Sequence, residues 1–252
     1  MLTKVLVIQF RINDSLLERE QNCINRSIGK ICQVDYVSAL KTDVDWQYPE
    51  TVVGHYDGFI LGGSGDLDFD GARAENDPAR HLSYEVLGRL RPLFQYIFDH
   101  DRPTLGICFG HQILGAFAGA QVHCDACQKK ICSHEVKFLV DKQDYFLFSD
   151  LPDSFYAHYG HKDVLDRVPA GATLLMTGGE SCQVSALQYK QNIYTVQFHP
   201  ELNYTDMIDR IKNSPGYLPE GAIVEEIFKD EPHSNTILEN FGKLVALSKK
   251  RD

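Results

Sequence analysis

Short apolar runs that alternate with helix-compatible stretches are the feature that most limits how this chain can fold. In the first half of the sequence the runs are Val5–Phe10, Val34–Ala39, Gly58–Leu61 and Thr104–Cys108. The stretches Ser15–Ile28 and Ala79–His100 lie between them and carry apolar residues at helical spacing. Strands that alternate with helices form parallel β-α-β units, and a continuously apolar run is typical of a buried parallel strand. The pattern predicts an α/β fold with an open, mostly parallel sheet flanked by helices.

The second half of the sequence predicts a small additional antiparallel portion. Its shorter strand candidates are Glu135–Val140, Ser154–Ala157, Thr173–Thr177, Val184–Tyr189 and Ile193–Phe198. Only Lys190, Gln191 and Asn192 separate the last two, and this spacing suits a hairpin. Helical stretches at Tyr204–Asn213 and Thr236–Leu247 follow.

Two further expectations concern helix continuity and domain organisation. Proline removes a helical hydrogen bond, so Pro92 predicts a kink in Ala79–His100 or a division into two helices. No internal repeat or linker divides the sequence, and we therefore expect residues 1–252 to form a single domain.

Composition and charge exclude several classes of protein. A hydrophobic fraction of 43% is typical of a globular domain with a full core, whereas a formal net charge of −10 disfavours nucleic-acid binding. No apolar run approaches the length of a membrane span, and the N-terminus lacks a signal-cleavage pattern. Seven cysteines, an odd number, favour a reducing compartment. We expect a cytoplasmic protein with neither nucleic acid nor a membrane as partner.

Cys108 stands on a glycine-rich turn between a predicted strand and a predicted helix. Gly106 and Gly110 flank it at a G-x-C-x-G spacing, which is the cysteine form of a nucleophile elbow. Such a turn lifts the side chain clear of the sheet and places it near a helix N-terminus, where the positive end of the helix dipole favours a thiolate. The alternative is a buried structural cysteine in an ordinary strand–helix connection.

A second motif supplies a base and a residue that could orient it. The stretch Ile193–Glu201 reads IYTVQFHPE, and Pro200 ends the strand, so that His199 lies at a strand end where open α/β sheets carry their sites. A cysteine nucleophile needs a base, and the base needs a group that fixes its orientation. Cys108, His199 and Glu201 supply these three groups in that order. The alternative is a surface turn without catalytic chemistry.

Acyl transfer also needs donors for a developing oxyanion. The stretch Leu61–Asp66 reads LGGSGD, and its glycines allow backbone N–H groups to point at a ligand. We take Gly63 as the main oxyanion donor, Gly65 as its reserve, and the N–H of Phe109 as the second donor. The alternative is a turn that simply reverses the chain.

The motifs GG, GICFGHQ and QFHPE, which span about residues 58–201, resemble those of the class I (triad-type) glutamine amidotransferase family. The resemblance implies a flavodoxin-like sheet and no cofactor. It also implies that Cys108 attacks the side-chain amide of glutamine, His199 carries the proton and Glu201 orients His199, after which water hydrolyses the glutamyl thioester. Gln112 matches a position that contacts the substrate in that family.

The resemblance extends to a loop that lines the substrate pocket in guanylate-synthase-type members. Ala157–Asp163 is similar to this loop, with His161 as a pocket-lining residue, although Lys162 stands where glycine is usual. Three alternatives remain for the function. A separate synthetase chain could accept the ammonia, the chain could hydrolyse glutamine or other γ-glutamyl compounds alone, or it could be an inactive binding scaffold. The polar segment Asp66–Asp77 and a pocket wall from Lys212–Pro232 favour hydrolysis without a partner.

A cluster of cysteine and histidine residues raises the question of a metal site. The stretch His123–His134 contains Cys124, Cys127, Cys132 and His134, all residue types that zinc accepts. Structural zinc sites more often use two well-separated ligand pairs, and only one C-x-x-C occurs here. We therefore expect no bound metal.

Overall fold

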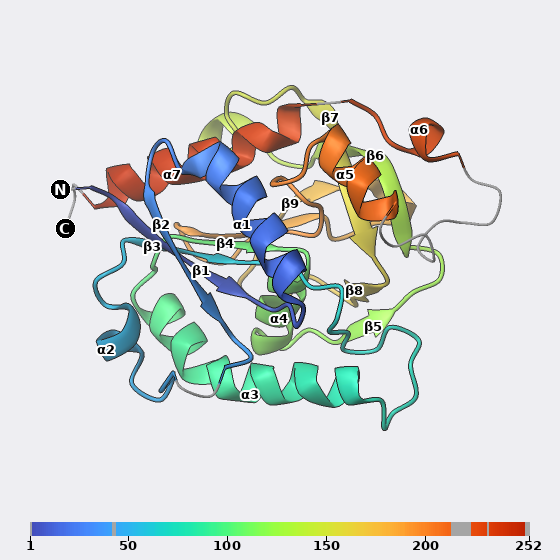
Figure 1. The fold of residues 1–252 in the computed structure, drawn as a ribbon. Helices are drawn as coiled ribbons and strands as arrows, with labels where there is room; N and C mark the ends of the chain where they lie inside the picture. Colours follow the sequence, from blue (N-terminus) through green and yellow to red (C-terminus); the bar gives the residue numbers. More distant parts are fainter. Residues whose placement is uncertain (1, 42–43, 213–222, 231, 250–252) are drawn as a thin grey trace.

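The computed structural model describes residues 2–41, 44–212, 223–230 and 232–249. Within these residues, nine strands form one sheet in the order β2-β1-β3-β4-β11-β10-β9-β6-β7 (Figure 1). The first five strands in this order are parallel to their neighbours: β2 (Gln33–Ser38), β1 (Lys4–Gln9), β3 (Gly58–Leu61), β4 (Thr104–Ile107) and β11 (Ile193–Val196). The predicted mostly parallel sheet is confirmed.

The other strands are antiparallel and extend the sheet at one edge. They are β10 (Ala186–Gln188), β9 (Thr173–Thr177), β6 (Lys130–Phe138) and β7 (Ser154–His161). A separate two-stranded sheet joins β5 (Val122–Cys124) and β8 (Asp163–Leu165). The expected hairpin is confirmed, because Leu187 of β10 lies opposite Thr195 of β11.

Helices cover both faces of the parallel strands. On one face lie α1 (Asp14–Ile28) and α7 (Thr236–Ser248), and on the other lie α3 (Pro78–Asp99) and α4 (Phe109–Phe117) (Figure 1). The remaining helical segments are α2 (Pro49–Val53), α5 (Tyr204–Lys212), α6 (Val224–Ile227) and the 3₁₀ turns Lys142–Asp144, Gly179–Ser181 and His233–Asn235. No helix among the described residues is long and apolar enough to span a membrane.

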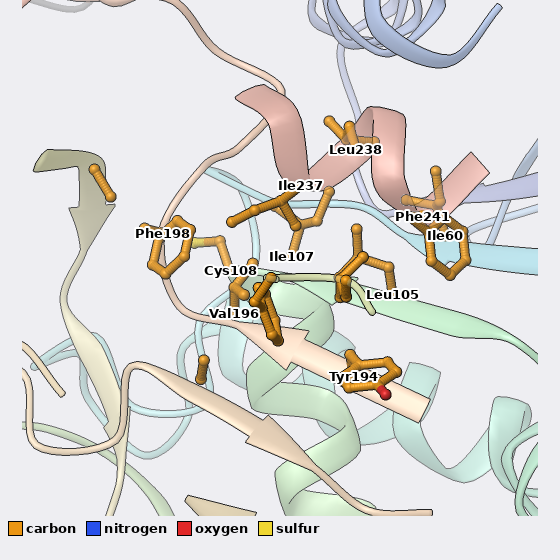
Figure 2. Close-up of a cluster of buried hydrophobic side chains, with 14 of the residues drawn as sticks. Ile60, Leu105, Ile107, Cys108, Tyr194, Val196, Phe198, Ile237, Leu238 and Phe241 are labelled. Carbon is orange, nitrogen blue, oxygen red and sulfur yellow. The ribbon is translucent and has the colours of Figure 1, made fainter. Parts of the chain in front are cut away.

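The alternation of side chains along β1 explains the two hydrophobic layers. Val5 and Val7 belong to the cluster beneath α1 and α7, whereas Leu6 and Ile8 belong to the cluster beneath α3 and α4. Successive residues of a strand point to opposite faces, so a strand covered on both faces is apolar at every position. Figure 2 shows the first layer, in which side chains of α7 lie beside those of β4 and β11, with Cys108 and Phe198 nearby.

Two expectations about helices have different outcomes. The predicted division of Ala79–His100 at Pro92 is wrong, because α3 is a single helix that contains this proline. The buried face of α3, which includes Leu90, Leu93 and Phe94, supplies tertiary packing that compensates for the hydrogen bond lost at the proline. The predicted Lys212–Pro232 segment contains α6, but residues 213–222 and 231 lie outside the described residues, and its role as a pocket wall stays a prediction.

The glycines of the elbow permit a close backbone approach at the centre of the sheet. The N–H of Gly110 donates to the carbonyl oxygen of Gly62 at 3.1 Å, which joins the start of α4 to the end of β3. A Cβ atom at Gly110 would lie 2.2 Å from the carbonyl oxygen of Leu61, and one at Gly106 would lie 2.8 Å from that of Gly110. Neither position has room for a side chain.

We predict that Gly110→Ala destabilises the protein by roughly 2–4 kcal/mol, because the methyl group would force the backbone of β3 away from α4. Urea unfolding followed by circular dichroism measures this change in the free energy of unfolding. Gly88→Ala is the matched control, since no heavy atom lies within 4 Å of its Cβ position, and alanine should stabilise this helix by about 0.5–1 kcal/mol. Equal stability of Gly110→Ala and the unmodified protein would contradict the steric argument.

Candidate functional site

Cys108 occupies a strained backbone position between β4 and α4. Its φ of 51° and ψ of −98° lie in a positive-φ region that L-residues rarely adopt, and such conformations persist only where surrounding contacts impose them. Those contacts include the bond from the Cys108 N–H to the carbonyl oxygen of Val196 at 2.9 Å. The turn places the buried thiol at the carboxyl end of the sheet and beside the N-terminus of α4.

His199 and Glu201 form a buried pair near this cysteine. Nδ1 of His199 lies 2.7 Å from Oε1 of Glu201, and both side chains are almost fully buried. Burial lowers the pKa of His199, but the Glu201 carboxylate and Cys108 outweigh it and raise this pKa to about 9. Burial raises the pKa of Glu201, whereas the His199 imidazole outweighs burial and lowers it below its usual value. The site therefore favours an imidazolium at His199.

The glycine turn after β3 lies against the same pair. A Cβ atom at Gly63 would lie 3.1 Å from Cε1 of His199 and 3.7 Å from Cβ of Cys108, so only glycine fits closely here. The N–H of Gly63 donates to Oε1 of Glu20 at 3.2 Å and is thus engaged by a carboxylate in this structure. The N–H of Phe109 has no acceptor among the described residues. Of Gly63 and Phe109, the two main expected donors, Phe109 is the one with an available N–H.

Gln112, expected to contact the substrate, is buried on α4. Its Nε2 donates to the carbonyl oxygen of Asp163 at 2.8 Å and lies 3.4 Å from Oε1 of Gln197. Gln197 in turn places its Nε2 3.7 Å from Sγ of Cys108. The two glutamines connect the elbow to β8, and the substrate contact of Gln112 stays a prediction.

The expected substrate-side loop Ala157–Asp163 is not a loop. Its residues lie mainly in β7 and β8, because β7 pairs with the long strand β6 along its whole length. His161 is buried, its Nε2 lies 3.1 Å from the carbonyl oxygen of Gln128, and burial lowers its pKa to about 3. Gly160, rather than His161, lines the cavity described below, so that the role of His161 also stays a prediction.

The segment Asp66–Asp77 is attached to the strand that follows His161. The carboxylate of Asp163 accepts hydrogen bonds from the backbone N–H groups of Asp70 and Gly71 at 2.9 and 2.6 Å. Nζ of Lys162, which stands where glycine was expected, lies 3.6 Å from a carboxylate oxygen of Asp68. These contacts hold the segment against β8.

Two adjoining cavities open beside the candidate triad. The larger has a volume of about 450 Å³ and is lined by side chains of α1 and α5 together with Gly65, Asp66 and Gly160. The smaller, of about 70 Å³, includes Glu201 in its wall. The larger volume falls within the range of about 300–1,000 Å³ that is typical of small-molecule sites. A buried Cys–His–Glu group beside such a cavity can perform nucleophilic acyl chemistry.

Sequence comparison places this geometry in a family. The family model described as "Glutamine amidotransferase class-I" matches residues 44–213, which is most of the chain. This chain belongs to that family.

Curated relatives of this amidotransferase include glutamine-hydrolysing subunits of GMP synthase. It is 38% identical over 105 residues to the subunit from Methanocaldococcus jannaschii, and the match covers 41% of this chain and 53% of that protein. It is 34% identical over 125 residues to the corresponding subunit from Methanopyrus kandleri, with coverage of 49% and 64%. The matched region thus spans less than two thirds of the length of either relative.

Solved structures show the same fold as this amidotransferase. A protein of Thermoplasma acidophilum that is described as a GMP synthase subunit has a TM-score of 0.68 at 21% identity and covers 100% of this chain and 98% of its own. A glutamine amidotransferase of Thermotoga maritima has a TM-score of 0.65 at 21% identity, with coverage of 99% and 94%. The flavodoxin-like architecture implied by the sequence motifs is confirmed.

An ion pair beside the triad was missed by the sequence analysis. Nε of Arg11 lies 3.1 Å from Oε1 of Glu20, and both side chains are buried. Oε2 of Glu20 accepts a further bond from Nε2 of Gln9 at 2.9 Å. A signal for Arg11 existed, since it follows the first apolar strand closely and the carboxyl ends of parallel strands carry sites. Glu20 has no such signal, because it is one of several charged residues on α1.

The cysteine and histidine residues of His123–His134 are divided between different sheets of the amidotransferase. Cys124 lies in β5 of the two-stranded sheet, whereas Cys132 and His134 lie in β6 of the large sheet. Nε2 of His134 lies 2.9 Å from the carbonyl oxygen of Gly178. Among the residues that the structure describes, no group of three or more His, Cys, Asp or Glu side chains is arranged to hold a metal ion.

We predict that Glu201→Gln lowers the pKa of His199 from about 9 to about 6.5 or below, because burial remains while the carboxylate charge is lost. A pH titration of the His199 ring by NMR measures it. Since the unfolded pKa is about 6.5, the pair stabilises the folded protein fully below that pH, and this stabilisation is lost as the pH rises through about 9.

The control for this titration is Glu239→Gln, which removes an exposed carboxylate of α7. It should leave the His199 titration unchanged. An unaltered His199 pKa in Glu201→Gln would contradict the assignment of Glu201 as the group that holds the proton on the imidazole.

Proposed function

We propose that this amidotransferase hydrolyses the amide bond of a γ-glutamyl substrate through Cys108, His199 and Glu201. The observation that carries the proposal is the 2.7 Å contact of His199 with Glu201 next to a cysteine on a strained strand–helix turn. The adjoining cavity of about 450 Å³ gives a substrate access to these groups. Nucleophile, base and orienting carboxylate then act as one unit.

The proposed reaction proceeds through a thioester. The Cys108 sulfur attacks the γ-carbonyl carbon of the substrate, and the developing oxyanion accepts a hydrogen bond from the N–H of Phe109. The imidazolium of His199 gives its proton to the departing amine, and the C–N bond breaks to leave a γ-glutamyl thioester. His199 then takes a proton from water, the hydroxide adds to the thioester, and glutamate is released while the proton returns to sulfur.

The electrostatics of the pair support this assignment. A pKa of about 9 keeps His199 protonated near neutral pH, so that an acid is available for the amine. Nη1 of Arg210 lies 3.4 Å from Nε2 of His199, and a guanidinium can only donate to that nitrogen when it carries no proton. At 3.4 Å this contact is weaker than the 2.7 Å contact with Glu201, which dominates the state of the ring.

We predict that Cys108→Ala lowers the hydrolysis of γ-glutamyl amides at least about 1,000-fold, because no other step supplies the nucleophile. Assays of released glutamate measure this, and circular dichroism checks the fold. Cys127→Ala, which removes an exposed cysteine outside the site, is the matched control and should retain full activity. Turnover by Cys108→Ala equal to that of the unmodified protein would exclude Cys108 as the nucleophile.

A second candidate function is the supply of ammonia to a separate synthetase chain. The curated relatives favour it, because those proteins are named as glutamine-hydrolysing subunits of GMP synthase. The bond between the Gly63 N–H and Glu20 also favours it, since an oxyanion donor that is engaged in the isolated chain could be released when a synthetase docks.

We predict that the purified chain alone hydrolyses γ-glutamyl dipeptides, because a cavity of about 450 Å³ beside the triad is larger than ammonia requires. Steady-state assays of glutamine and a panel of γ-glutamyl dipeptides, with and without a synthetase from the same organism, measure it. Negligible turnover of every compound, restored by the synthetase, would favour the second candidate and leave the triad assignment intact.

A further inference from the structure

The wall of the larger cavity carries an excess of positive charge. Arg11, Arg19 and Arg210 line it, and Asp66 is the acidic residue among the described residues of its wall. The same arginines line the smaller cavity that includes Glu201. This concentration is unexpected in a chain with a formal net charge of −10. Because a cavity with one sign of charge attracts ligands of the opposite sign, its ligand should carry a negative charge.

The carboxylates near these arginines are engaged by other groups. Glu20 pairs with Arg11, and Asp206 pairs with the exposed Arg26. Glu201 accepts from His199, and Asp66 accepts a hydrogen bond from the N–H of Ile12 at 3.0 Å.

Arg19 is the arginine of this group that lacks a partner. Among the described residues it has neither a hydrogen bond nor an ion pair, although its side chain is partly buried. Leu16, Arg19 and Cys23 are three and four residues apart on α1, so they share the face of the helix that turns toward the cavities. A guanidinium is always charged and presents a planar pair of donors that matches a carboxylate.

Helix packing brings Arg19 and Arg210 to the same side of the site. An apolar cluster joins Cys23 of α1 to Met207, Ile208 and Ile211 of α5, which fixes the two helices against each other. Arg210 projects from α5 to within 3.4 Å of Nε2 of His199. The two arginines therefore border the space on the imidazole side of the triad.

The proposed reaction assigns that space to the leaving group. His199 delivers its proton to the departing amine, so the amine must leave from the side of the imidazole. Ammonia would occupy little of a cavity of about 450 Å³, whereas an amino acid bound through its amino group would occupy more of it and bring a carboxylate near Arg19.

We propose that Arg19 binds the carboxylate of the amino acid that is joined to the γ-carbonyl group of the substrate. The substrate class is then γ-glutamyl amino acids with a free C-terminal carboxylate, and Arg19 determines the preference for them over neutral γ-glutamyl amides. This inference rests on the proposed hydrolysis of γ-glutamyl amides, because the orientation of the leaving group follows from it.

Binding measurements on the Cys108→Ala protein test the inference without requiring turnover. Calorimetry compares γ-glutamylglycine with γ-glutamylglycinamide, which differ only in the terminal carboxylate. We expect the acid to bind about 10- to 100-fold more tightly than the amide, as a charge-assisted pair would give. In Arg19→Gln this ratio should fall to about one, and Arg19→Lys, which keeps the charge but loses the planar donors, should retain part of it.

Arg91→Gln is the matched control, since Arg91 is an exposed arginine of α3 outside both cavities, and this variant should keep the full ratio. Equal binding of acid and amide, no binding of either, or an equal loss of both in Arg19→Gln would overturn the inference. The last result would assign Arg19 to the α-carboxylate of the glutamyl group. Turnover of γ-glutamylglycine by the unmodified protein tests the proposed hydrolysis separately.

Discussion

The close approach of α4 to the end of β3 is the constraint on which the geometry of the site depends. With a Cβ position at Gly110 only 2.2 Å from the carbonyl oxygen of Leu61, the elbow can pack against the glycine turn only because it lacks a side chain there. This packing holds Cys108 at a positive φ and brings Gly63 next to His199. Strain at one residue is thus maintained by the packing of the central strands.

Electrostatic pairing is the second condition for the site. Taking a charged group out of water is costly unless it has an oppositely charged partner, and the buried charges here form pairs. Glu201 pairs with His199, and Glu20 pairs with Arg11. The first pair raises the pKa of the imidazole, whereas the second engages the N–H of Gly63. The charge that the proposed chemistry uses and the charge that organises the glycine turn come from separate elements.

The two candidate functions place different demands on the same cavity. Release of ammonia to a synthetase needs a small outlet and a surface that a partner covers, whereas hydrolysis of a γ-glutamyl amino acid needs space and a counter-charge for the leaving group. The cavity of about 450 Å³ meets the second demand, as does Arg19, which has no partner in the described part of the chain. The segment Asp66–Asp77, held to Asp163 by its backbone N–H groups, forms a polar border of the site rather than an apolar docking surface.

The sequence alone determined the parallel sheet, its antiparallel extension, the elbow and the strand end that carries His199. These features follow from local patterns: apolar periodicity, a glycine on each side of a turning residue, and a proline after a strand. Tertiary structure alone decided that α3 continues through Pro92, that Ala157–Asp163 is mainly strand, and that Gln197 lies beside Cys108. It also decided that Glu20 engages Gly63, which lies 43 positions further along the chain. Such contacts join residues that are distant in the sequence, and their energies depend on burial and on which side chains meet when the helices pack on the sheet.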